Sequence, residues 1–270
     1  MYRGTRMPGA RVLVTGGGSG IGRLMALDAA RRGAEVVLWD IDAAAGDRVR
    51  EEIVAAGGAA TAAVVNVADR EAVAAAARGA GPVDVLINNA GVVTGRTLLE
   101  SSDAAIQRTF DVNVLALYWT TRAFLPGMLE RGRGTVVTIA SAAGLVGVAK
   151  QTDYSASKWA AIGFTESLRH ELRTEGHEVG TLVVCPYYID TGMFAGVTTK
   201  FPRLLPILKE GDVARRTVDA IEHGREQVIL PPLARLLAPA RILPVRAFDR
   251  LVDVFGINRT MDHFVGRRVR

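Results

Sequence analysis

The stretch RVLVTGGGSGIG at residues 11–22 decides the fold of this chain. Its first part, 11–15, is a short apolar run that predicts a buried strand, and the segment RLMALDAARRG at 23–33 predicts a helix. Between them Gly16, Gly20 and Gly22 let the backbone turn tightly and approach a pyrophosphate at the positive end of the helix. The stretch therefore predicts a dinucleotide-binding strand–turn–helix unit.

The next apolar run, EVVLWD at 35–40, predicts a second buried strand that ends in an acid. Asp40 lies where a carboxylate accepts hydrogen bonds from the adenosine ribose hydroxyls, and its charge repels a 2′-phosphate. Neither Ile41 beside it nor Ser19 in the glycine loop offers a positive charge for that phosphate. We therefore predict NAD (NADH) rather than NADP as the cofactor.

Short apolar runs alternate with helical patterns along most of the chain. Further strands are predicted at 60–66, 83–89, 135–141, 178–186 and 226–231, and helices at 43–56, 69–78, 102–130, 152–175 and 211–223 and in the tail. This alternation predicts an α/β fold: a single-domain, doubly wound parallel sheet of the Rossmann type, with about seven strands and helices on both faces. We expect a catalytic domain at 1–232 and a basic helical extension at 233–270 packed on it.

A tyrosine, a lysine and a serine carry the chemistry. Tyr154 and Lys158 lie four residues apart in a helical pattern, so both project from one face of the helix. A phenol titrates near ~10 and is a poor base at neutral pH, but a nearby ammonium favours the phenolate. Ser141 offers a hydroxyl that holds a substrate oxygen while the proton moves. We therefore predict a proton-transfer site.

Residues at the predicted strand ends converge on one edge of the sheet, where ligands bind in such folds. They are Asp40, Asn66, Asn89, Ser141 and Pro186. Inside the predicted helix at 102–130, Asn113 is a poor helix former, and a buried amide there needs hydrogen-bond partners.

Composition excludes several other classes of protein. The single cysteine, Cys185, lies in an apolar strand pattern and is interpreted as a buried, inert thiol, and the four histidines show no metal-ligand spacing. The N-terminal residues lack the apolar core of a signal peptide, and no window reaches 18 uninterrupted apolar residues. We expect no metal, no nucleic-acid partner and a cytoplasmic location.

The tail is the basic part of the chain. Residues 233–270 hold eight arginines against three aspartates, which accounts for the whole net charge of +5. One interpretation of 233–255 is an amphipathic surface that lies on anionic lipid, giving peripheral membrane contact. The other is a pair of helices packed on the domain or on a partner subunit, and Pro239 and Pro244 break any single long helix.

Together, TGGGSGIG, NNAG at 88–91, Asn113, Ser141 and YSASK at 154–158 resemble the short-chain dehydrogenase/reductase family over nearly the whole chain. The resemblance implies that Tyr154 is the acid/base, that Lys158 holds the nicotinamide ribose, that Ser141 orients the reacting oxygen and that Asn113 places a water in a proton relay. The implied cofactor-binding residues are Gly16, Gly18, Ser19, Gly20, Ile21, Gly22, Asp40, Ile41, Asn66, Val67, Asn89, Ala90, Gly91, Tyr154, Lys158, Pro186, Ile189 and Thr191.

Two positions depart from the family pattern. Asn66 stands where the family usually has an aspartate that accepts from the adenine amino group, and Tyr187 replaces a glycine beside the nicotinamide, so it should narrow or gate the pocket. The segment CPYYIDTGMF at 185–194 is similar to the retinol dehydrogenase and hydroxysteroid dehydrogenase branch, whose members usually carry an N-terminal hydrophobic anchor that this sequence does not show.

The segment 190–210 is long for a connection in a compact fold, and its apolar residues suit a lid over an apolar substrate. An ordinary packed excursion is the alternative interpretation. The predicted substrate-binding residues are Ser141, Tyr154, Tyr187, Met193 and Phe194.

We predict an NAD-dependent oxidoreductase acting on a large apolar alcohol or carbonyl, such as a steroid, retinoid or lipid. The alternatives are a ketoreductase of smaller carbonyl compounds and a non-catalytic NAD-binding sensor. By family habit, the helices at 102–130 and 152–175 would pair across a two-fold axis in a homodimer or homotetramer.

Overall fold

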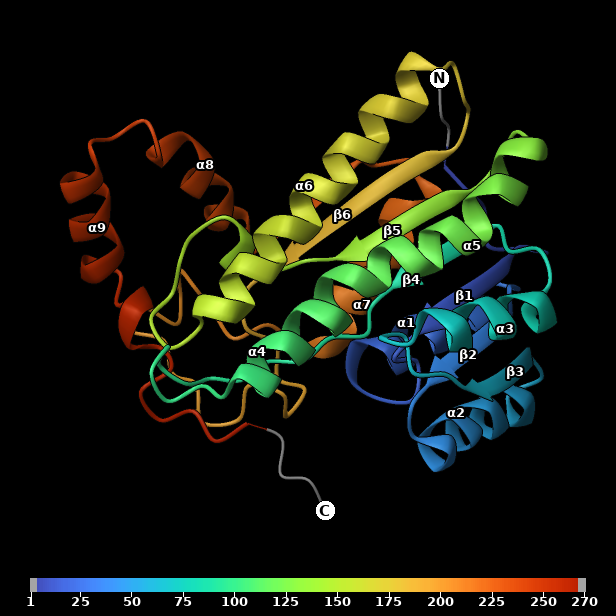
Figure 1. Cartoon of the computed structure of the whole chain (residues 1–270), viewed down its shortest axis with the longest axis horizontal. Coiled ribbons are helices and arrows are strands. Elements are labelled where there is room, and N and C mark those ends of the chain that lie inside the picture. The colour runs from blue at the N-terminus through green and yellow to red at the C-terminus, as the bar shows by residue number, and fades with distance from the viewer. Residues whose placement is uncertain (1–3, 267–270) are drawn as a thin grey trace.

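Seven parallel strands form one sheet in the computed structural model, which describes residues 4–266 (Figure 1). The strands are β1 (Arg11–Thr15), β2 (Glu35–Asp40), β3 (Ala59–Val64), β4 (Val85–Asn88), β5 (Thr135–Ile139), β6 (Gly180–Pro186) and β7 (Gln227–Leu230). Their order is β3-β2-β1-β4-β5-β6-β7. The order reverses between β1 and β4, and in such sheets a ligand binds at this switch point, beyond the carboxyl ends of the strands. The predicted doubly wound parallel sheet is confirmed.

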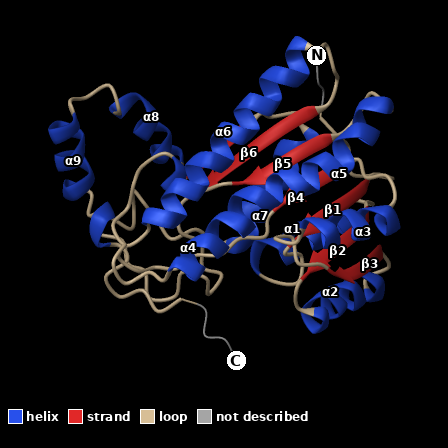
Figure 2. Ribbon diagram, in the orientation of Figure 1, coloured by secondary structure: helices blue, strands red, loops and turns tan. Residues whose placement is uncertain are grey.

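Helices cover both faces of the sheet (Figure 2). They are α1 (Gly20–Arg31), α2 (Ala43–Ala55), α3 (Arg70–Ala80), α4 (Asp103–Phe110), α5 (Ala116–Glu130), α6 (Thr152–Thr174), α7 (Glu210–Glu222), α8 (Leu237–Ala240) and α9 (Val245–Val254). Alternate residues of each strand serve opposite faces: Val12 and Val14 pack in one core with α1, α2 and α7, whereas Leu13 packs in the other with α3, α5 and α6. Apart from the edge strand β3, which is mostly exposed, the near-continuous apolar strands are therefore buried on both sides.

The segment predicted as one helix over 102–130 contains a change of helical type. Helices α4 and α5 are joined by a π-helical turn, Asp111–Leu115, and Asn113 lies in its middle. Short π-helical segments within α-helices are frequent at functional sites, because they change the hydrogen-bond register of the backbone.

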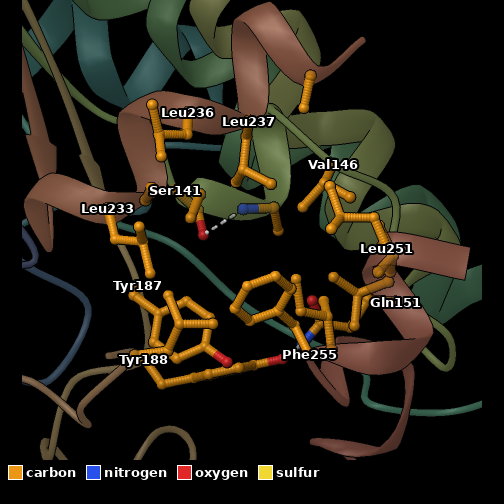
Figure 3. Close-up of a pocket in the computed structure, with 18 of the residues that line it drawn as sticks. Ser141, Val146, Gln151, Tyr187, Tyr188, Leu233, Leu236, Leu237, Leu251 and Phe255 are labelled. Atoms are coloured by element: carbon orange, nitrogen blue, oxygen red, sulfur yellow. Dashed lines mark hydrogen bonds between the residues drawn. The ribbon is translucent and has the colours of Figure 1, made fainter. Parts of the chain in front are cut away.

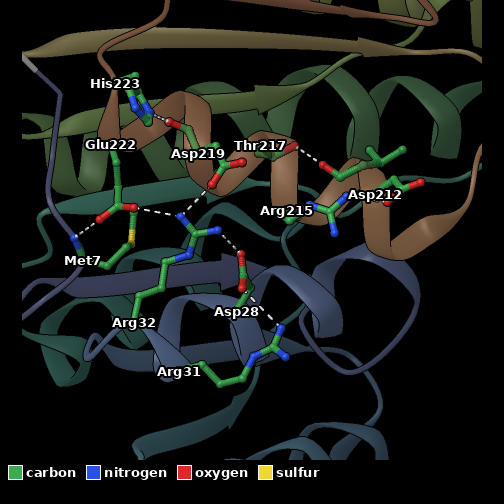
Figure 4. Close-up of polar contacts among 11 residues, drawn as sticks. Met7, Asp28, Arg31, Arg32, Asp212, Arg215, Thr217, Asp219, Glu222 and His223 are labelled. Atoms are coloured by element: carbon green, nitrogen blue, oxygen red, sulfur yellow. Dashed lines mark hydrogen bonds and ion pairs between the residues drawn. The ribbon is translucent and has the colours of Figure 1, made fainter.

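A polar cluster joins helices α1 and α7 (Figure 4). At the end of α1, Arg32 binds Asp28 at 2.7 Å and reaches across to Asp219 and Glu222 of α7 at 2.7 and 2.8 Å. Glu222 also accepts a hydrogen bond from the backbone N–H of Met7, which is fully buried. These carboxylates raise the pKa of Arg32, so the guanidinium remains charged and fastens α7 and the N-terminal segment to α1.

The C-terminal extension packs on the domain as short pieces over residues 233–266, and its predicted remainder, 267–270, lies outside the described residues. Figure 1 shows α8 and α9 apart from the sheet, on the side where α6 begins. The side chain of Arg241 connects them to the domain: its guanidinium carbon lies 4.4 Å from the ring centre of Trp159 and 5.1 Å from that of Phe248, and its Nε donates to the carbonyl of Leu145. Over residues 4–266, no helix has the length and apolar character needed to cross a bilayer.

Candidate active site

The predicted serine, tyrosine and lysine meet at the carboxyl end of β5. Ser141 follows that strand and begins a short 3₁₀ turn, whereas Tyr154 and Lys158 lie one turn apart on α6, each with only 5% of its surface exposed. The hydroxyls of Tyr154 and Ser141 are hydrogen-bonded. The Nζ atom of Lys158 lies 5.6 Å from the centre of the Tyr154 ring and donates to the carbonyl of Ile139 at 2.9 Å.

The acid–base balance of this site differs from the sequence-based expectation. Burial raises the pKa of Tyr154 to about 12, although the hydrogen bond with Ser141 acts in the opposite direction. Burial also lowers the pKa of Lys158 to about 8. The lysine was expected to bring the phenol into the working range, but in the protein alone the loss of water around both groups outweighs their attraction.

Asn113 has a structural role that can be read from its contacts. It is buried; its Oδ1 accepts from the backbone N–H of Val92 at 2.8 Å, and its Nδ2 donates to the carbonyl of Val92 and to Oγ of Ser157. Ser157 in turn donates to the backbone carbonyl of Tyr154. The amide thus ties the loop after β4 to the helix that carries the tyrosine and lysine, which satisfies its need for partners.

The glycine loop has the close backbone contacts that a pyrophosphate cradle requires. Gly16 and Gly20 have φ of 62° and 53°, in the left-handed region that disfavours side chains. A Cβ on Gly22 would collide with the carbonyl of Gly16. Asn89 holds the loop in place, because its Nδ2 donates to the carbonyls of Thr15 and Gly16 at 2.9 and 3.1 Å. With Ser19 as the residue before α1 and Ile21 buried in its first turn, the loop directs a helix N-terminus at the edge of the sheet.

Asp40 lies beside this loop. Its two oxygens accept from the backbone N–H groups of Gly18, at 2.8 Å, and Asp42, at 3.0 Å, and each oxygen keeps a further lone pair for a ribose hydroxyl. Next to it Ile41 is 67% exposed and offers no charge. These residues fit the adenosine half of NAD at the carboxyl end of β2.

The remaining predicted cofactor residues lie along the same edge of the sheet. After β3, Asn66 is exposed and accepts from the N–H of Ala68, and Val67 is buried. After β4, Gly91 has no room for a large side chain, because a Cβ would lie 3.3 Å from Asn113 Oδ1. The others in this group are Ala90, Pro186, Ile189 and Thr191, which are buried or half-buried around the ends of β4 and β6.

A cavity of about 280 Å³ opens onto Ser141 and Tyr154 (Figure 3). Its wall is mostly aliphatic and aromatic and includes the predicted residues Tyr187 and Phe194. The 190–210 segment covers one side of the cavity with Phe194 and Leu205, whereas Met193 is not in the wall. A parallel bridge between Ile189 and Leu208 closes the base of this segment.

Sequence reasoning missed most of the cavity wall. The C-terminal extension supplies a large part of it, including Leu233, Leu237, Phe248, Leu251, Val252 and Phe255. The four-residue spacing of Phe248 and Val252 on α9 indicated a packed helical face, but nothing in the sequence indicated that the face would line the catalytic cavity. The polar residue Gln151, three positions before Tyr154, was also missed.

Comparison with known proteins gives a consistent result. A family model described as short chain dehydrogenase matches residues 10–201. The chain is 41% identical to epidermal retinol dehydrogenase 2 of Mus musculus over 267 residues, covering 96% of this chain and 86% of the relative.

Two solved structures are similar over most of their length. A short-chain dehydrogenase/reductase from Burkholderia phymatum in complex with NAD is 31% identical, with a TM-score of 0.80 over 88% of this chain and 94% of that one. A metagenomic short-chain oxidoreductase in complex with NADP is 32% identical, with a TM-score of 0.71 over 83% and 97%.

Proposed function

The chain belongs to the short-chain dehydrogenase family, and we propose that it is an NAD-dependent oxidoreductase acting on an alcohol or carbonyl carbon of a large apolar substrate. The observation that carries this proposal is the cavity, in which Ser141 and Tyr154 present hydroxyls in a mostly aliphatic and aromatic wall. Such a wall buries a hydrocarbon skeleton, and the two hydroxyls can orient a single oxygen on it. The similarity to a retinol dehydrogenase supports the same substrate class.

In the oxidising direction, Ser141 Oγ hydrogen-bonds the substrate oxygen and Tyr154 Oη accepts the proton of the alcohol. The carbon–hydrogen bond breaks with its electron pair, and the carbon–oxygen bond becomes a carbonyl. When bound, NAD supplies the hydride acceptor and a positively charged ring. That charge, added to the ammonium of Lys158, would offset the burial that raises the pKa of Tyr154 to about 12. Lys158 and the bound cofactor would therefore both lower the pKa of Tyr154.

Cofactor choice follows from the end of β2. Asp40 is preorganised by two backbone N–H groups, so its carboxylate accepts from the ribose hydroxyls without reorienting. A 2′-phosphate would meet this negative charge and the exposed apolar side chain of Ile41. We propose NAD as the preferred cofactor on this basis.

We also propose that the outer surface of the extension contacts anionic lipid peripherally. The α8–α9 turn exposes Ile242 by 89% and Val245 by 75%, and Leu236 on its flank is 59% exposed. Arg246 and Arg250 are exposed on the same segment, beside the exposed Asp249 and Asp253, and their guanidinium groups can bind anionic headgroups. An apolar substrate dissolved in the bilayer would then be close to the cavity that this extension lines.

For the subunit arrangement we propose a homodimer or homotetramer. The helices predicted to pair, α5 and α6, expose Tyr118 and Trp159 by 42% each, and Leu115, the last residue of the π-helical turn before α5, is 37% exposed. An apolar face of this kind suits association across a two-fold axis.

The test of the catalytic proposal is absorbance at the reduced-nicotinamide band with NAD and NADP separately, across steroids, retinoids and long-chain secondary alcohols. Turnover with NAD that is lost in Tyr154→Phe supports the proposal. Preference for short-chain secondary alcohols, included in the same panel, would identify an enzyme of smaller substrates instead. NAD binding without turnover of any compound would indicate a sensor and overturn the catalytic assignment.

A further inference from the structure

A glutamine in the cavity wall has an acceptor without a donor. Gln151, the residue before α6, is fully buried and lines the cavity close to Tyr188 and Phe255 (Figure 3). Its Nε2 donates to the hydroxyl of Tyr188 at 3.3 Å and to the sulfur of Met261 at 3.0 Å. Its Oε1 is buried and has no hydrogen-bond partner among the described residues.

The neighbouring hydrogen bonds fix which end of the amide is unpaired. Thr260 donates its hydroxyl proton to the carbonyl of Ile257 at 2.8 Å, so its oxygen accepts from the hydroxyl of Tyr188 at 2.8 Å. The oxygen of Tyr188 is then left to accept from Gln151 Nε2, and the thioether sulfur of Met261 is also an acceptor. Turning the amide over would place its oxygen against that sulfur, so the free group is Oε1.

An unpaired buried carbonyl oxygen is costly, and most buried polar groups in proteins are paired. Asn113, on the opposite side of Tyr154, shows the contrast: both ends of its amide are bonded. The wall around Gln151 consists mainly of side chains such as Val146, Val148 and Leu205, which offer no donor. A donor for this oxygen must therefore come from what enters the cavity.

We propose that Gln151 is a specificity-determining residue that accepts a hydrogen bond from a second hydroxyl of the substrate, distinct from the oxygen that reacts. The proposal rests on the proposed function, because it assigns Ser141 and Tyr154 to the reacting oxygen. The terminal torsion of a glutamine is broad, so a small rotation turns Oε1 toward the cavity while Nε2 stays near Tyr188. The substrate class is thus an apolar alcohol or carbonyl compound that carries an additional hydroxyl.

The position of Gln151 limits where that hydroxyl lies. Gln151 and Tyr154 are three residues apart at the start of α6, where side chains at this spacing lie on one face with Cβ atoms about 5–6 Å apart. The second hydroxyl therefore belongs a few bonds from the reacting carbon, not at the far end of a long hydrocarbon chain.

The experiment compares matched alcohols that differ only in this hydroxyl. The probes are 4-, 6- and 8-methyldodecan-2-ol and the corresponding diols with a tertiary hydroxyl at the branch, which cannot be oxidised. The ratio of kcat/KM, diol over monool, is measured with NAD for the wild type and for Gln151→Met, which keeps the shape and removes the acceptor. Gln151→Leu is a second removal variant, and Leu205→Met is a control within the same wall.

We expect at least one diol to exceed its monool by about tenfold or more in the wild type and in Leu205→Met, because a buried acceptor discriminates strongly against a ligand that leaves it unpaired. In Gln151→Met the ratio should fall to about one through loss of the diol's advantage. Two results would overturn the proposal and leave the oxidoreductase assignment intact. One is a diol-to-monool ratio of about one in the wild type for every pair, and the other is an unchanged preference for the diol in both Gln151→Met and Gln151→Leu.

A binding measurement separates this proposal from the catalytic one. The thermal shift of the wild type with NAD and each alcohol reports binding without turnover. If no alcohol is oxidised, the proposed function fails, but a larger shift with a diol than with its monool would still support the role of Gln151. Equal shifts together with no turnover would overturn both.

Discussion

The buried lysine should make the protein less stable, and the cost should depend on pH. Lys158 is 5% exposed, and burial lowers its pKa from 10.5 to about 8. Because the unfolded chain binds a proton more readily, the penalty is fully present below about pH 8 and disappears as pH rises through 10.5. At one pKa unit per 1.36 kcal/mol, it amounts to about 3 kcal/mol at pH 7 and about 1 kcal/mol at pH 9.5.

Replacing the lysine with methionine should therefore stabilise the protein while abolishing turnover. Lys158→Met removes the penalty but leaves the carbonyl of Ile139 without its 2.9 Å hydrogen bond, which costs about 1 kcal/mol. The expected net gain in the free energy of unfolding is about 2 kcal/mol at pH 7 and close to zero at pH 9.5. Nearby Cys185 affects both variants alike, because burial raises the pKa of its thiol to about 12 and keeps it neutral in both folded proteins up to pH 9.5, so its contribution cancels in the difference.

The assay is urea denaturation of the cofactor-free wild type and of Lys158→Met at pH 7 and pH 9.5, with Lys209→Met as a control at an exposed position. The difference between wild type and Lys158→Met should shrink by about 2 kcal/mol over this interval, and the control should show no such trend. Parallel curves for wild type and Lys158→Met would refute the reasoning, because a lysine that pays no burial penalty has the same pKa in the folded and unfolded states.

Four further predictions address the cofactor, the fold and the extension. Asp40→Ser should lower the preference for NAD over NADP, measured as a ratio of kcat/KM, by about tenfold or more, and an unchanged ratio would contradict the ribose role. Arg32→Met should reduce the free energy of unfolding by about 1–2 kcal/mol in urea denaturation, since it removes the charged bonds between α1 and α7. Arg241→Ala should raise KM for a long apolar alcohol more than it lowers kcat, because the extension loses its clamp on the domain; equal effects on both would argue against it. The pair Ile242→Glu and Val245→Glu should abolish co-flotation with phosphatidylserine-containing vesicles, and flotation equal to the wild type would exclude this surface as the lipid contact.

The features of the fold and of the site that depend on residues close together in the sequence could be predicted. The apolar runs gave all seven strands. Most of them are apolar because a parallel sheet is buried on both faces, whereas the edge strand β3 is an alanine-rich run that is largely exposed. The i, i+4 spacing placed Tyr154 and Lys158 on one face of α6, and strand ends placed Asp40 and Asn89 at one edge of the sheet. Asn113 was identifiable as a helix residue in need of partners, although the π-helical turn around it was not.

What could not be predicted depends on contacts between segments far apart in the sequence. The direction of the pKa of Tyr154 is one case: the sequence shows a lysine one turn away, but only the packed structure shows that both groups lose their water. Met193 is another, since its apolar character suited the lid but its position in the turn keeps it out of the cavity wall.

The sequence left two interpretations of the extension open: helices packed on the domain, and a surface that contacts lipid. Different residues of the same short segment are compatible with each of them. The face of α9 that carries Phe248 and Val252 is buried and lines the cavity, as a packed helix would be. The neighbouring turn leaves the apolar side chains of Ile242 and Val245 exposed. A helix pair that packs only on its own domain has no need of such an exposed apolar surface. One short segment thus forms part of the wall of the proposed substrate cavity and an exposed apolar surface outside it. If lipid covers that surface, any change that detaches the extension from the bilayer also acts on the wall of the cavity, so membrane binding and substrate affinity should vary together.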